Sequence, residues 1–466
     1  MEQIDIFLKL VKDWIWGTPL LLLLLGTGAY LTIVLKGVQF RYLGYAFKQV
    51  LAKQRRESKG DISHFEALMT SLAGAIGTGT IVGVATAITF GGLGAIFWMW
   101  VTAFLSMATK YAESLLAVKY REIDARGEMS GGPMQYIAKG LGWKRMASLF
   151  AVLGMIAAFS TGNLVQTNSI AEGVYHVWQI DSWITGIVLC LLTAIVIIGG
   201  VKFIGHVASV LVPVMASLYI GAACIILIMN FSRIPEALML ILHSAWNGQA
   251  ATGGFMGASV MMAIQMGVAR SVFSNEAGLG ISSIAAAAAK TDSSARQALV
   301  TMTGALISTV IVCTVTGVVL AVTNVVGASA KSGQVLNGAA LAIAAFNKHI
   351  PGGEYIVTVG LILFAYTTVL AWSYYGEKCC EYLFGERSII AFRILFALIV
   401  IPGTILKMEI AWYLADISNG LMVIPNLIAL IGLSRVTIKE TQTFLAATQK
   451  EEHPLVDFGR IGEIGE

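Results

Sequence analysis

Two hydrophobic stretches of this 466-residue chain carry clustered glycines at their centres. The first reads Ala73-Gly-Ala-Ile-Gly-Thr-Gly-Thr80 and the second reads Phe273-Ser-Asn-Glu-Ala-Gly-Leu-Gly280. Each glycine costs a helix about 1 kcal/mol relative to alanine, so such clusters favour a break. In a bilayer a helix can unwind only where protein or a water-filled cavity satisfies its freed backbone groups. Paired breaks in two halves of a chain therefore point to the binding site of a transporter.

The first break offers backbone groups for both a carboxylate and a cation. The freed amides of Gly77, Thr78 and Gly79 would open a second half-helix, whose positive end suits a carboxylate. The freed carbonyls of Ala73 and Ile76 suit a small hard cation. The alternative interpretation is a packing motif, in which small residues let two helices approach closely.

The second break carries charge at membrane depth, which is costly and marks functional sites. Arg270 and Glu276 either contact a substrate or pair with each other or with backbone and hold the break in shape. We favour the structural role for both charges. The backbone around Phe273 and Ser274 and the side chain of Asn275 are then the better candidates for substrate contact.

Two further polar pairs lie within apolar stretches. Thr367 and Thr368 present adjacent hydroxyls, although helical threonines usually bond the preceding turn. Asn163 and Gln166 are three residues apart and share a helix face, so they either bind a substrate or bond a neighbouring helix.

Composition places the chain in the membrane. It is 57% hydrophobic and 12% charged, against about 25% charged residues in soluble domains.

Lys110 and Glu113, three residues apart, are expected to pair in a structural or gating role. No catalytic cluster of carboxylates or histidines, no metal spacing among five cysteines and no Walker motif is present, so we expect no enzyme, no ATP and no nucleic-acid partner.

The apolar pattern predicts an all-α membrane protein with about eleven transmembrane helices. The segments are 14–36, 64–90, 93–120, 146–177, 182–200, 204–231, 256–290, 295–327, 354–376, 388–407 and 409–434. Lys and Arg concentrate in alternate loops and in the C-terminal tail, which predicts an N-terminus outside and a C-terminus in the cytoplasm.

This topology makes the second to sixth and the seventh to eleventh segments two inverted five-helix repeats, each opening with a broken helix. The predicted units are an extra N-terminal helix with an amphipathic linker, two repeats and a cytoplasmic tail, at 1–63, 64–231, 232–434 and 435–466. An interfacial helix is expected over 40–51. The stretch 335–346 is either an extracellular lid or an ordinary packed helix.

Several motifs resemble those of the alanine/glycine:cation symporters, also called sodium:alanine symporters. Gly91-Gly-Leu-Gly-Ala-Ile-Phe-Trp-Met-Trp100 is similar to the family signature, and the second break with Ile284-Ala-Ala-Ala-Ala-Ala-Lys290 is similar to another hallmark. Phe364-Ala-Tyr-Thr-Thr and Tyr374-Tyr-Gly-Glu377 resemble a third. The chain departs from the pattern at Ser106, where glycine is usual, and at Ser308, where aspartate is expected.

The resemblance implies a leucine-transporter-like fold that imports small neutral amino acids, alanine and glycine, with sodium across the plasma membrane. It implies sodium as the coupling ion and no other cofactor. It also suggests, less strongly, that the Thr80 hydroxyl is a ligand of a second sodium ion. The alternative is proton coupling through Glu276 or Glu113. The implied sodium ligands are the carbonyls of Ala73, Ile76 and Phe364 and the hydroxyls of Thr367 and Thr368.

Overall fold

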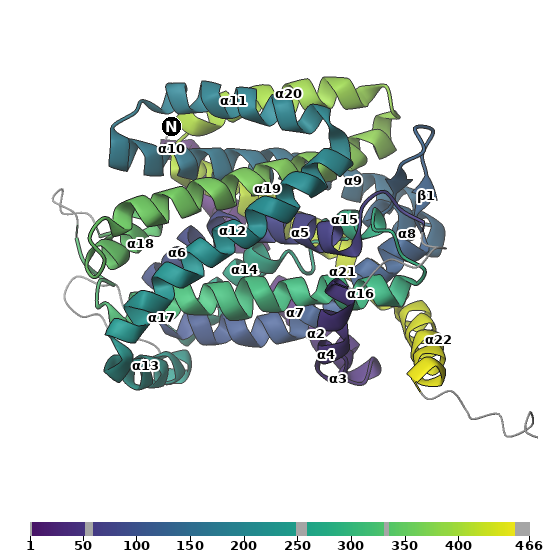
Figure 1. The fold of residues 1–466 in the computed structure, drawn as a ribbon, viewed down its shortest axis with the longest axis horizontal. Coiled ribbons are helices and arrows are strands. Elements are labelled where there is room, and N and C mark those ends of the chain that lie inside the picture. The colour runs from purple at the N-terminus through teal and green to yellow at the C-terminus, as the bar shows by residue number, and fades with distance from the viewer. Residues whose placement is uncertain (1, 52–58, 248–258, 330–334, 453–466) are drawn as a thin grey trace, which may run out of the picture.

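The structure, a computed structural model, describes residues 2–51, 59–247, 259–329 and 335–452. Over these residues it is helical apart from one two-stranded hairpin, β1 (Glu122–Ile123) with β2 (Met129–Ser130) (Figure 1). Six helices are long and apolar enough to cross a membrane, and a bent N-terminal pair makes a seventh candidate. The chain is thus an all-α membrane protein, while the eleven-helix count and the inverted repeat remain predictions.

The first predicted break is present. Helix α5 (His64–Ala75) begins at a capping box in which Ser63 and Glu66 satisfy each other's backbone amides. It ends at Ile76, and a single 3₁₀ turn, η1 (Thr78–Thr80), leads into α6 (Val82–Gly91). The glycines therefore interrupt this helix where the sequence places them.

The second predicted break is present as well. Helix α14 (Val260–Asn275) ends where Glu276 adopts a left-handed backbone, with φ of 58°. Gly278 and Gly280 follow with φ of 90° and 76°, a conformation that side chains rarely tolerate. The second half, α15 (Ser283–Ala287), is only five residues long.

The long helices form the body of the molecule and surround both broken helices. Two of them contain a π-helical turn, η2 and η4. They are α7 (Gly94–Lys119), α9–η2–α10 (Lys144–Phe159, Ser160–Leu164, Val165–Trp178), α11 (Ser182–Ile198), α12 (Gly200–Met229), α16–η4–α17 (Ser294–Ala305, Leu306–Cys313, Thr314–Val322), α19 (Gly353–Phe384), α20 (Ser388–Ile405) and α21 (Met408–Gly432).

Shorter or peripheral helices complete the fold. Helix α18 packs on α6 and α19 with most of its side chains buried, as expected of a packed helix. Helices α3 and α4 occupy the stretch predicted as an interfacial helix. These elements are α1 (Glu2–Ile15), α2 (Thr18–Val34), α3 (Val38–Arg41), α4 (Leu43–Val50), α8 (Pro133–Gly140), η3 (Phe231–Arg233), α13 (Ile234–Asn247), α18 (Gly338–Asn347) and α22 (Ser434–Glu452).

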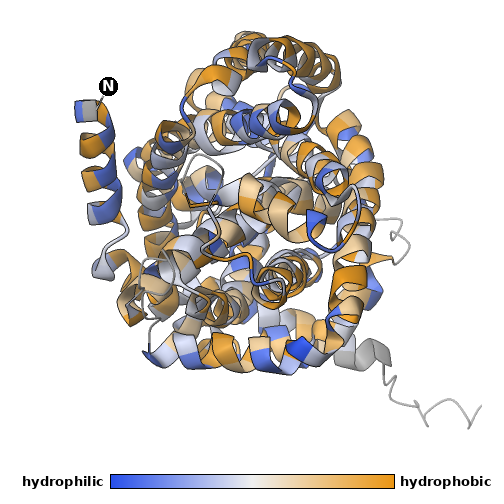
Figure 2. Cartoon of the chain, turned by 90° about the vertical axis from the view of Figure 1, so that its left-hand side faces the viewer, coloured by the Kyte–Doolittle hydropathy of each residue, from blue (hydrophilic) through white to orange (hydrophobic). Residues whose placement is uncertain are grey.

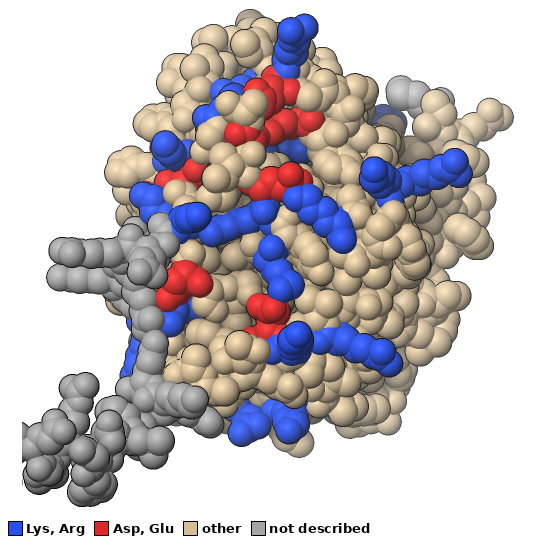
Figure 3. Space-filling view, turned by 90° about the vertical axis from the view of Figure 1, so that its right-hand side faces the viewer, with Lys and Arg blue, Asp and Glu red and all other residues tan. Residues whose placement is uncertain are grey.

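The surface chemistry differs between the sides and one end of the bundle. Hydrophobic residues cover much of the outward-facing helix surface (Figure 2). Lys and Arg gather, with some Asp and Glu, on the end that carries β1 and α8 (Figure 3). An apolar belt with a basic end is the pattern of a membrane protein.

Candidate functional site

The first break lies against helices α10 and α19. The amide of Thr78 donates to Gln166 Oε1 at 3.1 Å, while the 3₁₀ turn uses the amides of Thr80 and Ile81. A Cβ on Gly77 would overlap Thr368 Oγ1 and would lie 2.8 Å from Gln166 Oε1. Position 77 must therefore be glycine for the backbone to lie this close to Thr368 and Gln166. The bonds made by the amides of Thr78, Thr80 and Ile81 do not involve the Gly77 amide.

Oxygen atoms from α5 and α19 converge beside this break. Thr368 Oγ1 lies 2.7 Å from the Ala73 carbonyl and 3.0 Å from the Phe364 carbonyl. Ile76 leaves the helix with φ of −85° and ψ of 66°, which takes its carbonyl out of the α-helical direction. Two of the expected cation ligands, the Ala73 and Phe364 carbonyls, are thus within hydrogen-bond distance of a third, Thr368 Oγ1. An all-oxygen set of this kind suits a small hard cation.

Thr367 points elsewhere than its neighbour. Its hydroxyl lies 3.0 Å from the Phe364 carbonyl and 3.5 Å from Met215 Sδ on α12. Of the two threonines, only Thr368 forms a hydrogen bond from α19 to the broken helix within the described residues. Thr80 bonds the Gly77 carbonyl at 2.9 Å, within its own turn.

An aromatic and charged layer covers the other side of the first break. Phe273 packs on Gly79, where a Cβ would lie 2.6 Å from Phe273 Cδ1, and its ring centroid is 4.9 Å from that of Trp412. Arg270 Nη2 bonds Asp416 Oδ2 at 2.6 Å, and its guanidinium lies 4.6 Å from the Trp412 ring centroid. Both charged side chains are about 6% exposed.

A cavity of about 630 Å³ adjoins this layer. Its lining comes from α1, α2, α6, α14 and α21, with Asn337 just before α18, and includes Arg270, Asp416, Trp412 and Gln265. The four residues Arg270, Asp416, Phe273 and Trp412 therefore separate the first break from this cavity, and we call them the aromatic–ionic layer.

Arg270 does not pair with Glu276, which was one of the alternatives considered for these two charges. Arg270 lies six residues earlier, about 9 Å along the helix, and reaches α21 instead. Both carboxylate oxygens of Glu276 are buried and lack a hydrogen-bond partner among the described residues. The indole N–H of Trp372 faces the same carboxylate, but at hydrogen-bonding geometry it reaches only the Gly74 carbonyl, at 3.4 Å.

The expected pairing of Lys110 with Glu113 is wrong, because the second break uses both groups. Lys110 Nζ donates to the carbonyl of Asn275, the last residue of α14, at 2.8 Å. Glu113 Oε1 accepts from the amides of Gly278 and Gly280, at 2.8 and 3.1 Å. A cation at a helix C-terminus and a carboxylate on free amides both stabilise an interrupted helix.

Three of the predicted substrate contacts also make hydrogen bonds that hold neighbouring parts of the protein together. Asn163 donates to the Phe396 carbonyl at 2.7 Å, because it lies in the π-turn η2 and no longer shares a face with Gln166. Ser274 faces η4, with Cys313 Sγ at 3.0 Å. Asn275 Oδ1 accepts from the Ala277 amide at 3.0 Å and caps its own break.

Sequence reasoning missed two residues of this region. Asp416 pairs with Arg270, and Asn426 donates to Glu113 Oε1 at 2.7 Å and to the Gly278 carbonyl at 2.8 Å. Both lie in the last apolar segment of the sequence. An acid and an amide at membrane depth are rare, so their presence there could have marked them as functional or structural polar contacts.

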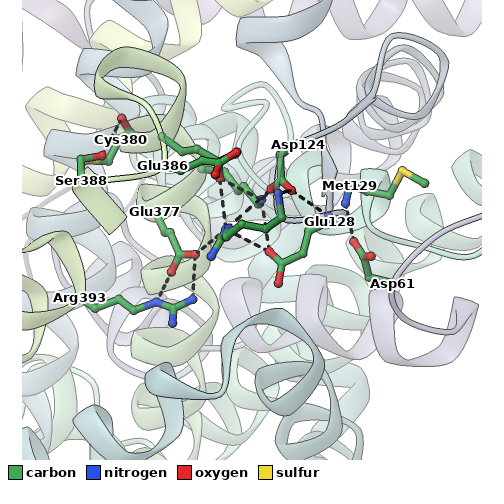
Figure 4. A network of polar contacts seen from close by, with 12 residues as sticks. Asp61, Asp124, Glu128, Met129, Glu377, Cys380, Glu386, Ser388 and Arg393 are labelled. Atoms are coloured by element: carbon green, nitrogen blue, oxygen red, sulfur yellow. Dashed lines mark hydrogen bonds and ion pairs between the residues drawn. The ribbon is translucent and has the colours of Figure 1, made fainter. Parts of the chain in front are cut away.

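An ion-pair network closes the basic end of the bundle (Figure 4). Lys378 bonds Asp124 at 2.8 Å, and Glu377 bonds Arg393 at 2.6 Å, which fixes the β1–β2 hairpin and α20 to α19. Burial raises the pKa of Asp124, but hydrogen bonds from Lys378 and the Glu128 amide outweigh it and hold that pKa below its ordinary value.

The fold and this site define a class: leucine-transporter-like secondary transporters, built around two interrupted helices. A solved structure of MhsT with L-phenylalanine has the same fold, with a TM-score of 0.55 and 11% identity over 84% of this chain and 99% of that one.

The sequence matches the sodium:alanine symporter family over residues 1–458, and the chain belongs to that family. It is 51% identical to the sodium/alanine symporter AgcS of Methanococcus maripaludis, over 93% of this chain and 96% of AgcS. It is 49% identical to a transporter of Haemophilus influenzae whose substrate its name does not state, over 95% and 96% of the two chains. The protein is therefore a multi-pass membrane transporter and not an enzyme, as its sequence predicts.

Proposed function

We propose that this chain imports alanine and glycine together with sodium across the plasma membrane by alternating access, with its N-terminus outside and its C-terminus in the cytoplasm. The observation that carries the proposal is the convergence of Ala73, Phe364 and Thr368 oxygens beside the free backbone of the first break. One side of the break is suited to a small cation and the other to a carboxylate. Together these groups suit an amino acid and a sodium ion bound side by side.

The dimensions of the break favour a small substrate. Gly77 and Gly79 leave no room for even a Cβ against Thr368 and Phe273. A substrate held by the amides of Gly77 and Gly79 therefore meets Gln166 and Phe273 at close range. The surroundings of the break are therefore tight, which favours the smallest amino acids, alanine and glycine, and AgcS is named for alanine.

Two closures fit an alternating-access cycle. On one side stands the aromatic–ionic layer. The second closure, on the other side of the breaks, joins the segment before α5 to the segment after α15. Asp61 N donates to the Ala288 carbonyl at 2.8 Å, and Lys290 N donates to the Ile62 carbonyl at 2.7 Å. Arg121 Nη1 adds bonds of 2.7 Å to the carbonyls of Ala287 and Ala289. The broken helices are thus held together at one end and, through the aromatic–ionic layer, near their breaks, and an alternating-access cycle would open these two contacts in turn.

The test is uptake of labelled alanine into proteoliposomes at fixed pH, with external sodium replaced by choline. We expect uptake to fall to the level of empty liposomes in choline, and excess glycine to compete in sodium. Uptake that is equal in sodium and choline would refute sodium coupling. Competition by leucine as strong as by glycine would refute the small-substrate assignment.

A further inference from the structure

The short helices α3 and α4 leave the direction of the membrane spans. Helix α2 ends in a turn in which the Gly37 amide donates to the Thr32 carbonyl at 2.8 Å, and both Lys36 and Gly37 have left-handed backbones, with φ of 54° and 64°. After this turn α4 runs crosswise to the long helices α7 and α16 (Figure 1). Helices α3 and α4 are therefore placed to lie along the surface of a membrane that α2 crosses.

One face of α3 and α4 is exposed, and it combines bulky apolar side chains with cations. Its exposed positions recur at intervals of three and four residues, as one face of a helix requires. Phe40, Phe47 and Leu51 are 56%, 42% and 80% exposed. Arg41 and Lys48 are exposed on the same face, and neither helix contains an acidic residue. We call these five residues the α3–α4 surface.

The α3–α4 surface has the composition of a contact with a negatively charged membrane. Phenyl rings and leucine side chains are stabilised among the acyl chains just below the headgroups, and Arg and Lys are stabilised beside the phosphates. Single exposed apolar residues are ordinary on any protein, but three on one face with two cations and no acid are typical of an interfacial helix. Charge complementarity therefore favours anionic phospholipid over neutral lipid as the molecule that covers this surface.

The opposite face of α4 is bonded to α16 through Arg296. Arg296 Nη1 donates to Tyr45 Oη at 2.8 Å and to Gln49 Oε1 at 3.1 Å. Arg296 Nε donates to Asp292 Oδ1, one turn earlier in the chain, at 2.9 Å. The Phe444 ring of α22 lies 5.4 Å from the Arg296 guanidinium carbon, and its centroid is 6.2 Å from that of Tyr45. Because Arg296 is buried, a displacement of α4 has to break these bonds or carry α16 along.

Helix α16 begins directly after the second closure. Thr291 N donates to the Lys59 carbonyl at 3.2 Å, and Lys290 N donates to the Ile62 carbonyl at 2.7 Å. The Thr291 hydroxyl donates to the Ser293 carbonyl at 2.9 Å, at the start of α16. Helix α4 also packs on α5, which follows the other segment of the closure. Helix α4 therefore contacts the helices on both sides of this closure.

We propose that the α3–α4 surface binds the headgroups of anionic phospholipids in the cytoplasmic leaflet, with Arg41 and Lys48 on the phosphates, and that the bound lipid stabilises the second closure. The proposal rests on the orientation and the closures of the proposed function and adds a regulatory partner to them. Opening of the closure separates α5 from α16, so α4 must then give up one of its two contacts. Lipid that fixes α4 in its present position favours the closed arrangement, because a ligand shifts an equilibrium towards the state that it binds better.

The test follows the backbone amides that bond across the closure, which are those of Asp61, Ile62, Lys290 and Thr291. Their hydrogen exchange is measured by mass spectrometry on the full chain in nanodiscs of phosphatidylcholine, with and without phosphatidylglycerol. We expect phosphatidylglycerol to slow this exchange about 5- to 30-fold, since a Lys or Arg near an anionic surface contributes a factor of about 5. Native mass spectrometry counts the phosphatidylglycerol molecules that the protein retains.

A double variant and its matched control locate the effect. Arg41→Gln with Lys48→Gln should retain less phosphatidylglycerol and should exchange equally in the two kinds of nanodisc. Lys144→Gln with Arg145→Gln removes the same charge from exposed positions at the start of α9. This control should keep the wild-type slowing of exchange.

Two further variants test the link to the closure. Arg296→Gln should retain as much phosphatidylglycerol as the wild type but lose the slowing of exchange. If Arg296→Gln does not fold, Tyr45→Phe removes only the hydroxyl that accepts from Arg296. It should reduce the slowing while leaving lipid retention unchanged.

The outcomes separate this proposal from the proposed function. Equal exchange of the wild-type protein in both kinds of nanodisc would overturn the proposal. Slowing that persists in the Arg41/Lys48 variant, or that is lost equally in the Lys144/Arg145 control, would overturn the assignment to the α3–α4 surface. Full slowing in a folded Arg296→Gln protein would overturn the link to the closure. These measurements use neither alanine nor a sodium gradient, so their failure leaves sodium-coupled uptake intact, whereas loss of sodium dependence in uptake would overturn the proposed function itself.

Discussion

A single methyl group at Gly77 should weaken sodium binding without unfolding the protein. In Gly77→Ala the new Cβ overlaps Thr368 Oγ1 and lies 2.8 Å from Gln166 Oε1. Thr368 is in the middle of the 32-residue helix α19, so its backbone cannot move far. The hydroxyl must then leave the Ala73 and Phe364 carbonyls, which removes one of the expected sodium ligands.

The magnitude follows from the cost of inserting a methyl group into a packed interior, about 1–3 kcal/mol. If relief of that strain requires Thr368 to turn away, the sodium-competent arrangement is depopulated by the same free energy. The sodium half-saturation concentration for alanine uptake should therefore rise by about 5- to 150-fold. The assay is initial alanine uptake by proteoliposomes across a sodium series at constant ionic strength.

The matched control is Gly83→Ala, in the same broken helix. Its Cβ would meet nothing closer than Arg270 Cδ at 3.7 Å, so its sodium half-saturation should stay near the wild-type value. Thermal stability of both purified variants separates a local effect from loss of folding. A Gly77→Ala protein that is folded and has an unchanged sodium half-saturation would refute the placement of the cation between α5 and α19.

Four further predictions concern the site, the ion-pair network and the topology. Alanine amide, which lacks the carboxylate, should compete with alanine at least about 10-fold more weakly, because a charge-assisted contact is lost; equal competition would argue against a carboxylate site at the first break. Thr368→Val should raise the sodium half-saturation at least about 10-fold, and Thr367→Val should raise it much less, since only Thr368 bonds Ala73; the reverse order would contradict the assignment. Because the pKa of Asp124 is depressed in the folded protein, its ionised form stabilises the fold fully above the unfolded pKa of about 3.9, and this stabilisation is lost as the pH falls through the folded pKa. Thermal melts should therefore show a smaller loss of stability on acidification for Asp124→Asn than for the wild type. Identical pH profiles of the melting temperature would count against this prediction. Cysteine at Lys59 should react with an impermeant reagent only from the cytoplasm and cysteine at Lys348 only from outside, so labelling from one face would contradict the predicted topology.

The sequence predicted the two breaks because their cause is local. Glycines at 77 and 79 and at 278 and 280 act on their own backbone, and no distant partner is needed to see the effect. The proximity of Thr368 to Ala73 came from the family resemblance rather than from spacing, since the two residues are almost 300 positions apart. The structure then showed which of the two threonines makes the contact.

The partners of the charged residues could not be predicted from spacing. Residues three apart share a helix face, so the spacing favoured a Lys110–Glu113 pair. In the structure both side chains instead bond the unpaired backbone groups of the second break: Lys110 the Asn275 carbonyl and Glu113 the Gly278 amide. The partner of Asn163 could not be predicted for a different reason: the π-turn at Ser160–Leu164 changes the angular position of the following residues, and no sequence signal indicated it.

The central claim is that the sodium gradient drives transport of the amino acid. The most direct test is to reverse the direction of the sodium gradient and measure the direction of net alanine movement. Proteoliposomes are loaded with alanine at the external concentration, and the membrane potential is clamped at zero. An inward sodium gradient should then drive net alanine accumulation, and reversal of the gradient should drive net alanine loss. Alanine that stays at equilibrium under either gradient, while labelled alanine still exchanges across the membrane, would contradict sodium-coupled transport.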